Sequence, residues 1–341
     1  MKDNKYPIMT QEEFNILAKK HNSFLKGMDG GEMMQLHGMT LRGINMNSIN
    51  LMYANISHCT FVSCDMGAVN LSYCRIYDSE FVDSDLPEAK FDWAEITQVK
   101  FDGVDFEKSS FTRSTIDHSR FSGCRLISVD FSMSKMSNVT ITLSALESSA
   151  FKNAVITDSN MSQNDFSEVE FRNAQIMMLT FYKSTFYHTS FTDTDIWHSS
   201  FNECRLNGAK FLTSKFIGKT TFYSANIGNT EFCLVFMRSI IMKAATISNS
   251  QFKFCEMNNT DLSESRISDT KILNTDLSSS TLFGAYIVGS EIFESILEGS
   301  NIGNAKIVQS EFTDVKSDGI NIDGTIFDNT TPLIKIAGSA E

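Results

Sequence analysis

Residues 51–76 read LMYANISHCTFVSCDMGAVNLSYCRI, and every fifth residue of this stretch, starting from Leu51, is large and apolar. The period extends well beyond the stretch. Each fifth position from Leu36 to Phe216 holds Leu, Ile, Met or Phe, over 37 consecutive positions, and after one inserted residue the series resumes at Phe222 and holds for 19 positions, to Phe312. A helix has a period of about 3.6 residues and a strand a period of about 2. A strict period of five therefore indicates an internal repeat.

The residue two places before each of these large apolar residues, which we call centres, is usually small, as in Ala54, Cys59 and Cys64. Two inward side chains per five residues fit a chain that turns a corner every five residues, so four units would close one coil of 20 residues. Like residues also recur at 20-residue spacing, as expected when each coil of a solenoid stacks on its neighbour. One such set is Phe91, Phe111, Phe131, Phe151, Phe171, Phe191 and Phe211.

Several segments share one five-residue sequence pattern: Tyr73-Cys74-Arg75-Ile76, Ser84-Asp85-Leu86, Asn259-Thr260-Asp261-Leu262 and Gly299-Ser300-Asn301-Ile302. This pattern resembles that of the pentapeptide-repeat family, whose units approximate A-(D/N)-L-x-x, although Ser, Thr, Cys and Val often replace Ala here. The resemblance covers about residues 31–327 and implies an all-β solenoid, a right-handed quadrilateral parallel β-helix. Residues 36–316 would make about 14 coils.

The two ends and one interruption divide the chain. Thr10-Gln11-Glu12-Glu13 has the pattern of a capping box, so residues 1–30 are predicted to form an N-terminal helical cap. The repeat occupies residues 31–316, with an irregularity at 217–221 that predicts a bulge or small corner loop. Residues 317–341 are predicted to form a closing coil and tail, in which Pro332-Leu333-Ile334 closes the last coil.

Cysteine usage and hydropathy favour a cytoplasmic protein. Six of the seven cysteines occupy the small inward position, where they act as small hydrophobic residues, and reduced thiols fit the cytoplasm. The sequence shows no signal peptide and no apolar run long enough to span a membrane. A bacterial effector exported without a cleaved signal would have the same features.

Catalytic and metal-binding signals are weak. His58, His118 and His198 share one outward position but lie three and four coils apart, about 14 and 19 Å, too far to share one metal ion. The repeat accounts for Cys59 and Cys64 without zinc. No phosphate-binding loop, nucleophile elbow or dinucleotide fingerprint is present. We therefore expect no enzyme, no metal and no cofactor.

Charge is distributed unevenly. The formal net charge is −12, and one coil concentrates acids that we call the acidic belt: Asp78, Glu80, Asp83, Asp85, Glu88, Asp92 and Glu95. Between Arg205 and Lys253 basic residues prevail instead. The belt is either ordinary solvation or a polarised surface that orients a charged partner.

Outward apolar residues give the second candidate surface. Met177, Trp197 and Ile217 each follow a centre in successive coils, so they should stack about 5 Å apart and face solvent. Leu234, Phe236 and Ile241 also fall at positions expected to face solvent. A contiguous apolar patch indicates a partner or self-association surface. Packing of Ile217 and its neighbours around the insertion is the alternative.

These features favour a non-catalytic scaffold or binding rod whose partner is another protein or a second copy, with no direct nucleic-acid binding. The family resemblance adds two alternatives. Acidic pentapeptide-repeat dimers mimic DNA and protect gyrase, a type II topoisomerase, from quinolones or toxins, and some bacterial members are effectors delivered into host cells. The chain's length, its basic middle and the lack of projecting loops disagree with the first alternative.

Overall fold

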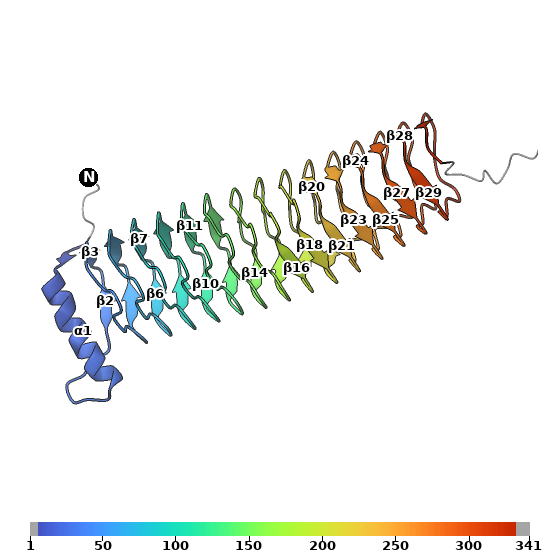
Figure 1. The fold of residues 1–341 in the computed structure, drawn as a ribbon. Coiled ribbons are helices and arrows are strands. Elements are labelled where there is room, and N and C mark those ends of the chain that lie inside the picture. Colours follow the sequence, from blue (N-terminus) through green and yellow to red (C-terminus); the bar gives the residue numbers. More distant parts are fainter. Residues whose placement is uncertain (1–5, 332–341) are drawn as a thin grey trace, which may run out of the picture. The chain divides into compact units, whose positions relative to one another are not determined.

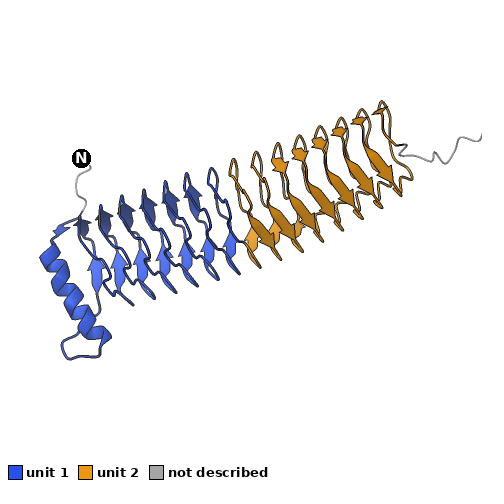
Figure 2. Cartoon of the chain, in the orientation of Figure 1, with its two compact units in different colours: residues 1–170 blue, residues 171–341 orange. Residues whose placement is uncertain are grey.

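The computed structural model describes residues 6–331, which form a parallel β-solenoid of about 15 turns preceded by one short helix (Figure 1). The chain divides into two compact units, unit 1 (residues 1–170) and unit 2 (residues 171–341; Figure 2). The predicted all-β solenoid with an N-terminal helix is confirmed. The turn count exceeds the predicted one because strand pairing continues past residue 316, to β30 (Ile326–Asp328).

Unit 1 contains α1 (Gln11–Leu25) and two rows of short strands. The first row is β1 (Ile8–Met9), β3 (Thr40–Arg42), β5 (Thr60–Val62), β7 (Glu80–Val82), β9 (Lys100–Asp102), β11 (Arg120–Ser122) and β13 (Thr140–Thr142). The second row is β2 (Gln35–His37), β4 (Asn55–Ser57), β6 (Arg75–Tyr77), β8 (Glu95–Thr97), β10 (Thr115–Asp117), β12 (Lys135–Ser137) and β14 (Val155–Thr157). Neighbours within each row are hydrogen-bonded, so each row is one side of the coils.

Unit 2 contains three rows. The first is β15 (Gln175–Met177), β17 (Asp195–Trp197) and β19 (Lys215–Ile217). The second is β16 (Ser190–Thr192), β18 (Lys210–Leu212), β21 (Glu231–Cys233), β23 (Gln251–Lys253), β25 (Lys271–Leu273), β27 (Glu291–Phe293) and β29 (Glu311–Thr313). The third is β20 (Asn226–Gly228), β22 (Thr246–Ser248), β24 (Arg266–Ser268), β26 (Tyr286–Val288), β28 (Lys306–Val308) and β30.

The core is a set of stacked centres. Strand register pairs Ile56 with Ile76, an offset of 20 residues that confirms four units per coil. In unit 1, the ring of Phe111 stacks between those of Phe91 and Phe131, with centroids 4.5 and 5.0 Å away. All three rings are fully buried. Stacked aromatic pairs contribute about 0.5–1.5 kcal/mol beyond their buried area, so the recurrence of Phe is explained by packing.

Each corner is made by the second residue after a centre, which adopts a positive φ. Ser48 (58°), Ser63 (50°) and Asp78 (42°) are examples in unit 1. This left-handed conformation costs most L residues about 1–2 kcal/mol, and Gly, Asn and Asp tolerate it best. The corner therefore accounts for the five-residue period and favours particular residue types at one outward position.

The N-terminal cap forms as predicted. The Thr10 hydroxyl accepts a hydrogen bond from the Glu13 N–H (3.2 Å), and the Glu13 carboxylate accepts one from the Thr10 N–H (2.8 Å). Phe14 and His21 are fully buried on the first coil, where His21 Nδ1 accepts a hydrogen bond from the Met34 N–H (2.9 Å). Burial lowers the pKa of His21 and favours its neutral form. Helix α1 therefore covers the first core layer (Figure 1).

The interruption at residues 217–221 changes the pairing offset from 20 to 21 residues for one coil, and the row of β15, β17 and β19 ends there, with only an isolated bridge from Lys215 to Phe236 beyond it. Trp197 pairs with Ile217, whereas Lys210 pairs with Glu231. The predicted closing segment Pro332-Leu333-Ile334 lies outside the described residues. Within residues 6–331, no helix combines the length and apolar character that a membrane crossing requires.

Candidate functional site

The predicted apolar patch centres on three neighbouring strands of unit 2. Strand register pairs Met177 with Trp197 and Trp197 with Ile217. The preceding residue of each strand, such as Ile196, is buried, so the following side chain lies on the outer face. Trp197 is 40% exposed, and its two neighbours are half-buried. These three residues form one contiguous outward row, which we call the apolar column.

The other three predicted patch residues are more scattered. Phe236 bridges to Lys215 on the same side of the coil, one coil further on, and the Arg238 guanidinium lies 4.5 Å from its ring centroid. Leu234 is 58% exposed at the preceding corner. Ile241 is half-buried one corner further along the chain. The patch therefore extends from the apolar column to Phe236, while Leu234 and Ile241 lie on its margins.

The insertion next to the apolar column is a compact bulge. Gly218 has a φ of 71°, and a Cβ there would collide with the His198 ring. The Lys219 N–H donates a hydrogen bond to His198 Nδ1 (3.2 Å), and Thr220 is fully buried. Because Ile217 is half-buried beside the bulge, local packing explains part of that residue's apolar character.

Basic residues lie near the apolar column, and Lys215 pairs in register with Asp195 of the strand that carries Trp197. Lys243 forms an ion pair with Glu264 (3.1 Å), and hydrogen bonding to that carboxylate raises the pKa of Lys243. Arg238 is likewise ion-paired with Glu256. Within residues 6–331, four lysines of the basic stretch have no ion pair: Lys210, Lys215, Lys219 and Lys253. The field at this surface therefore favours an acidic partner.

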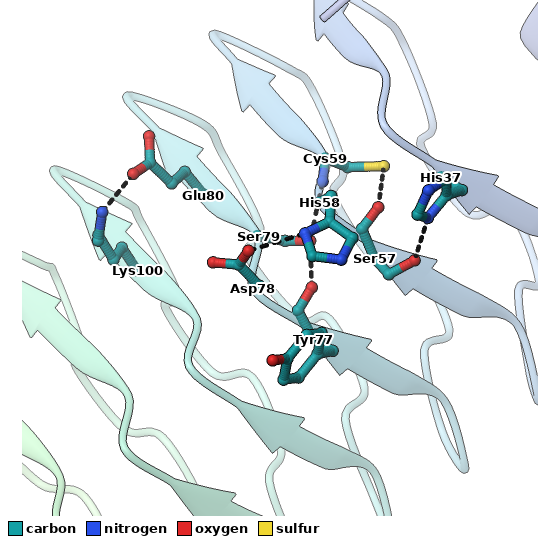
Figure 3. Close-up of polar contacts among 9 residues, drawn as sticks. All are labelled: His37, Ser57, His58, Cys59, Tyr77, Asp78, Ser79, Glu80 and Lys100. Carbon is teal, nitrogen blue, oxygen red and sulfur yellow. Dashed lines mark hydrogen bonds and ion pairs between the residues drawn. The ribbon is translucent and has the colours of Figure 1, made fainter. Parts of the chain in front are cut away.

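The acidic belt runs around one coil of unit 1. Three carboxylates are paired: Asp78 with His58 (2.7 Å), Glu80 with Lys100 (2.5 Å) and Glu95 with Arg75 (3.1 Å; Figure 3 shows the first two). Three belt residues occupy positive-φ corners: Asp78, Asp83 and Glu88. Since Asp tolerates this conformation, corner geometry explains part of the belt without a ligand.

Two histidines that the sequence analysis did not group together meet on the outer face. The rings of His37 and His58 are 5.2 Å apart and edge to face, with His37 Nδ1 near the Ser57 hydroxyl (2.9 Å; Figure 3). The sequence analysis missed this pair because the two residues occupy different positions of the repeat. No group of three or more His, Cys, Asp or Glu side chains in residues 6–331 could hold a metal ion.

The six inward cysteines are buried, as predicted. The Cys59 thiol donates a hydrogen bond to the Ser57 carbonyl (3.3 Å; Figure 3). Burial raises the pKa of Cys74 and of Cys204 to about 12. A thiol that stays protonated at neutral pH is a poor nucleophile and metal ligand. These cysteines therefore fill the core.

One outward cluster in unit 1 was missed. Tyr53, Tyr73 and Trp93 lie at corners of successive coils and stack on one another, and we call them the aromatic ladder. Their 20-residue spacing at the second position after a centre was the available signal. The apolar column instead occupies the first position after a centre.

Comparisons with known proteins agree with this repeat. Residues 34–111 match a family model described as a pentapeptide repeat region, and residues 105–142 match one described as pentapeptide repeats (8 copies). No functionally curated protein matches the chain in sequence.

Solved structures of pentapeptide repeat proteins are similar in part. HetL, involved in heterocyst differentiation regulation in the cyanobacterium Nostoc sp. strain PCC 7120, is 13% identical, with 77% of this chain and 93% of that chain covered and a TM-score of 0.24. QnrB1, a plasmid-mediated fluoroquinolone resistance protein, is 14% identical over 81% of this chain and 93% of that chain, with a TM-score of 0.21. By the family-model matches over residues 34–142, and by the same five-residue period that continues to Phe312, this chain resembles pentapeptide repeat proteins.

Proposed function

We propose that the protein is a non-catalytic binding protein that docks another protein on unit 2, through the apolar column. The supporting observation is the register of Met177, Trp197 and Ile217, which makes a continuous outward row with a part-exposed Trp at its centre. Contiguous exposed apolar surface is typical of interaction sites, and Trp is enriched among residues that dominate binding energy. The unpaired lysines nearby favour a partner with an acidic rim.

The test replaces Trp197 with Asp, which puts a charge at the centre of the apolar column without touching the buried centres. We expect loss of partner capture from lysate of the native cell, or a shift to a smaller species in sedimentation velocity if the partner is a second copy. The matched control is Leu143→Asp, an exposed corner residue of unit 1. If Trp197→Asp keeps both the captured protein and the oligomeric state of the parent chain, the apolar column is not the docking site.

Protection of a type II topoisomerase by the acidic belt is the alternative, and its geometry is less favourable. Two belt carboxylates are neutralised by Lys100 and Arg75, whereas a DNA mimic needs a dense and regular negative charge. A gyrase supercoiling assay with quinolone separates the two functions. Rescue of supercoiling at micromolar protein would favour topoisomerase protection over partner docking by unit 2.

A further inference from the structure

The aromatic ladder is a continuous outward stack in unit 1. The ring centroids of Tyr53 and Tyr73 are 5.2 Å apart with an interplanar angle of 24°, and those of Tyr73 and Trp93 are 6.1 Å apart at 5°. The Arg113 guanidinium, one coil further on, lies 4.9 Å from the Trp93 ring. All three aromatic residues are close to half exposed. The ladder therefore presents apolar surface over three successive coils.

Folding does not call for aromatic residues at these corners. The φ angles of Tyr53, Tyr73 and Trp93 are 67°, 60° and 61°, a conformation in which bulky L residues are strained. The same corner position elsewhere in unit 1 holds Gly43, with a φ of 62°, polar residues such as Ser, Asn and Asp, and also the larger Arg113, Met133 and Leu143, but no further Tyr, Trp or Phe. Stacking within the ladder offsets some strain, but a small residue would avoid it. A ligand-binding role would explain why aromatic residues stand here.

A groove runs beside the ladder. It has a volume of about 350 Å³, and its opposite wall is polar. In that wall Arg75 is ion-paired with Glu95 (3.1 Å), and Asn55 donates a hydrogen bond to Gln35 (3.1 Å). The groove is lined by Met33, Tyr53, Asn55, Tyr73, Arg75, Trp93 and Glu95. It therefore combines an aromatic wall with a row of hydrogen-bonding side chains.

The ladder also carries unused donors. Within residues 6–331, the hydroxyls of Tyr53 and Tyr73 and the indole N–H of Trp93 have no protein hydrogen-bond partner. All three donors belong to the aromatic wall. A ligand with regularly spaced carbonyl acceptors and apolar rings would use both features of that wall.

Two common ligands of aromatic surfaces fit less well. Sugars and nucleic-acid bases stack on an open ring face, but the ladder's faces are taken up by one another and by Arg113. Charge also disfavours a polyanion. Residues 1–170 contain 15 Lys and Arg against 23 Asp and Glu, a formal charge of −8. The groove beside the aromatic ladder therefore favours a neutral or basic ligand.

The axial spacing fits one peptide conformation. Successive coils are about 4.8 Å apart, so Tyr53 and Trp93 are separated by two steps, about 9.6 Å. A polyproline II helix rises about 3.1 Å per residue with three residues per turn, about 9.3 Å. In an extended strand, side chains on the same face recur about every 6.6 Å, which does not match the separation of about 9.6 Å between Tyr53 and Trp93. Polyproline II carbonyls have no internal hydrogen bonds, and proline-rich segments dock in aromatic-lined grooves.

We propose that the groove of unit 1 binds a proline-rich segment of a partner protein in the polyproline II conformation, with a basic residue beside the prolines. The pyrrolidine rings pack against the edges of the stacked rings, because the faces between successive rings are occupied. The two Tyr hydroxyls and the Trp93 N–H donate to peptide carbonyls. Glu95, whose side chain is 63% exposed despite its pairing with Arg75, receives the basic residue.

The test is calorimetric titration of the full chain with a synthetic peptide of about eight residues, a length that covers the groove, with a central run of prolines and a terminal Arg. We expect saturable binding that weakens at least tenfold in Tyr73→Ala and in Trp93→Ala. The matched control is Tyr223→Ala in unit 2, since Tyr223 and Tyr73 are similarly exposed, 46% and 44%. That variant should bind as the parent does, and far-UV circular dichroism should be unchanged in all three.

Several results would overturn the proposal: no saturable binding, equal affinity for a peptide with Gly and Ser in place of Pro, or equal loss in Tyr223→Ala. A neutral oligosaccharide or oligothymidylate that binds with Tyr73 dependence while the peptide does not would also overturn it. Replacing the terminal Arg by Glu should weaken binding, and unchanged affinity would contradict the role of Glu95. Trp197 takes no part, so failure here is distinct from failure of docking by unit 2.

Discussion

The aromatic ladder of unit 1 and the apolar column of unit 2 are both outward rows of three residues spaced by 20, and each contains one of the chain's two tryptophans. The two rows differ in the backbone conformation at their residues. Trp93 lies at a corner with a φ of 61°, whereas Trp197 is the last residue of strand β17. The corner position strains a bulky residue, while the strand position favours one. The repeat thus offers two kinds of outward site, and a large side chain carries more backbone strain at the corner than in the strand.

The two surfaces also differ in charge. Residues 1–170 have a formal charge of −8, and residues 171–341, with 14 Lys and Arg against 18 Asp and Glu, have −4. The cations without ion pairs near the apolar column strengthen the contrast. We therefore expect the two surfaces to select partners of opposite charge, with salt weakening both interactions.

The largest effect should separate inward from corner positions. Phe252 is a centre and 1% exposed, whereas Phe254, two residues on, is 55% exposed at a corner. Phe252→Ala should lower the free energy of unfolding by about 3–5 kcal/mol, because it leaves a cavity in the ring stack. Phe254→Ala should change it by less than about 1 kcal/mol. Urea denaturation measures both, and similar losses would contradict the assignment of the two positions.

A smaller effect should distinguish the bulge of unit 2 from an ordinary corner of unit 1. Gly123 has a φ of 61° and open space around its Cα, while Gly218 has a φ of 71° and faces the His198 ring. Gly123→Ala should cost about 1 kcal/mol through the backbone alone. Gly218→Ala should cost about 0.5–1.5 kcal/mol more, because the imidazole must leave its rotamer. Equal midpoints for the two variants in urea would show that the bulge is not packed on His198.

The smallest effect tests the comparison of the two tryptophans directly, by the same substitution in both. Trp93→Asn loses stacking worth about 0.5–1.5 kcal/mol but relieves corner strain of similar size, so the unfolding free energy should stay within about 0.5 kcal/mol of the parent. Trp197→Asn puts a poor strand former in β17 and should cost about 1 kcal/mol. A larger loss of unfolding free energy for Trp93→Asn than for Trp197→Asn would contradict this prediction, because it would show that the corner tryptophan contributes more to folding than the strand tryptophan.

Most of the fold was predictable because the repeat leaves few alternatives. The centres from Leu36 onward determine which side chains are inward, and the 20-residue recurrence of Phe and Ile determines the coil. The capping box at Thr10 and Glu13 is a local signal, and it identified the N-terminus of α1. These features depend on residues near in sequence or at a fixed spacing, so they can be read without coordinates.

The candidate sites were less predictable. The apolar column was found because all three residues immediately follow a centre. The ladder required comparison of corner positions, and the pairing of Arg75 with Glu95 or of His37 with His58 depends on side-chain rotamers that the period does not specify. The exposure of Ile217 depends on how Gly218 packs on His198. Such contacts are set by neighbours one coil away.

By itself, the sequence determined the coil, its inward residues and the place of the single insertion, because a five-residue period with 20-residue recurrence admits one way to bury the centres. Only the tertiary structure decided which outward residues meet. Side chains on the outer face do not contribute to the period, so their stacking, ion pairing and exposure are determined only when successive coils stack on one another. The aromatic ladder and its groove are the clearest case, since three corner residues acquire a common surface solely through that superposition.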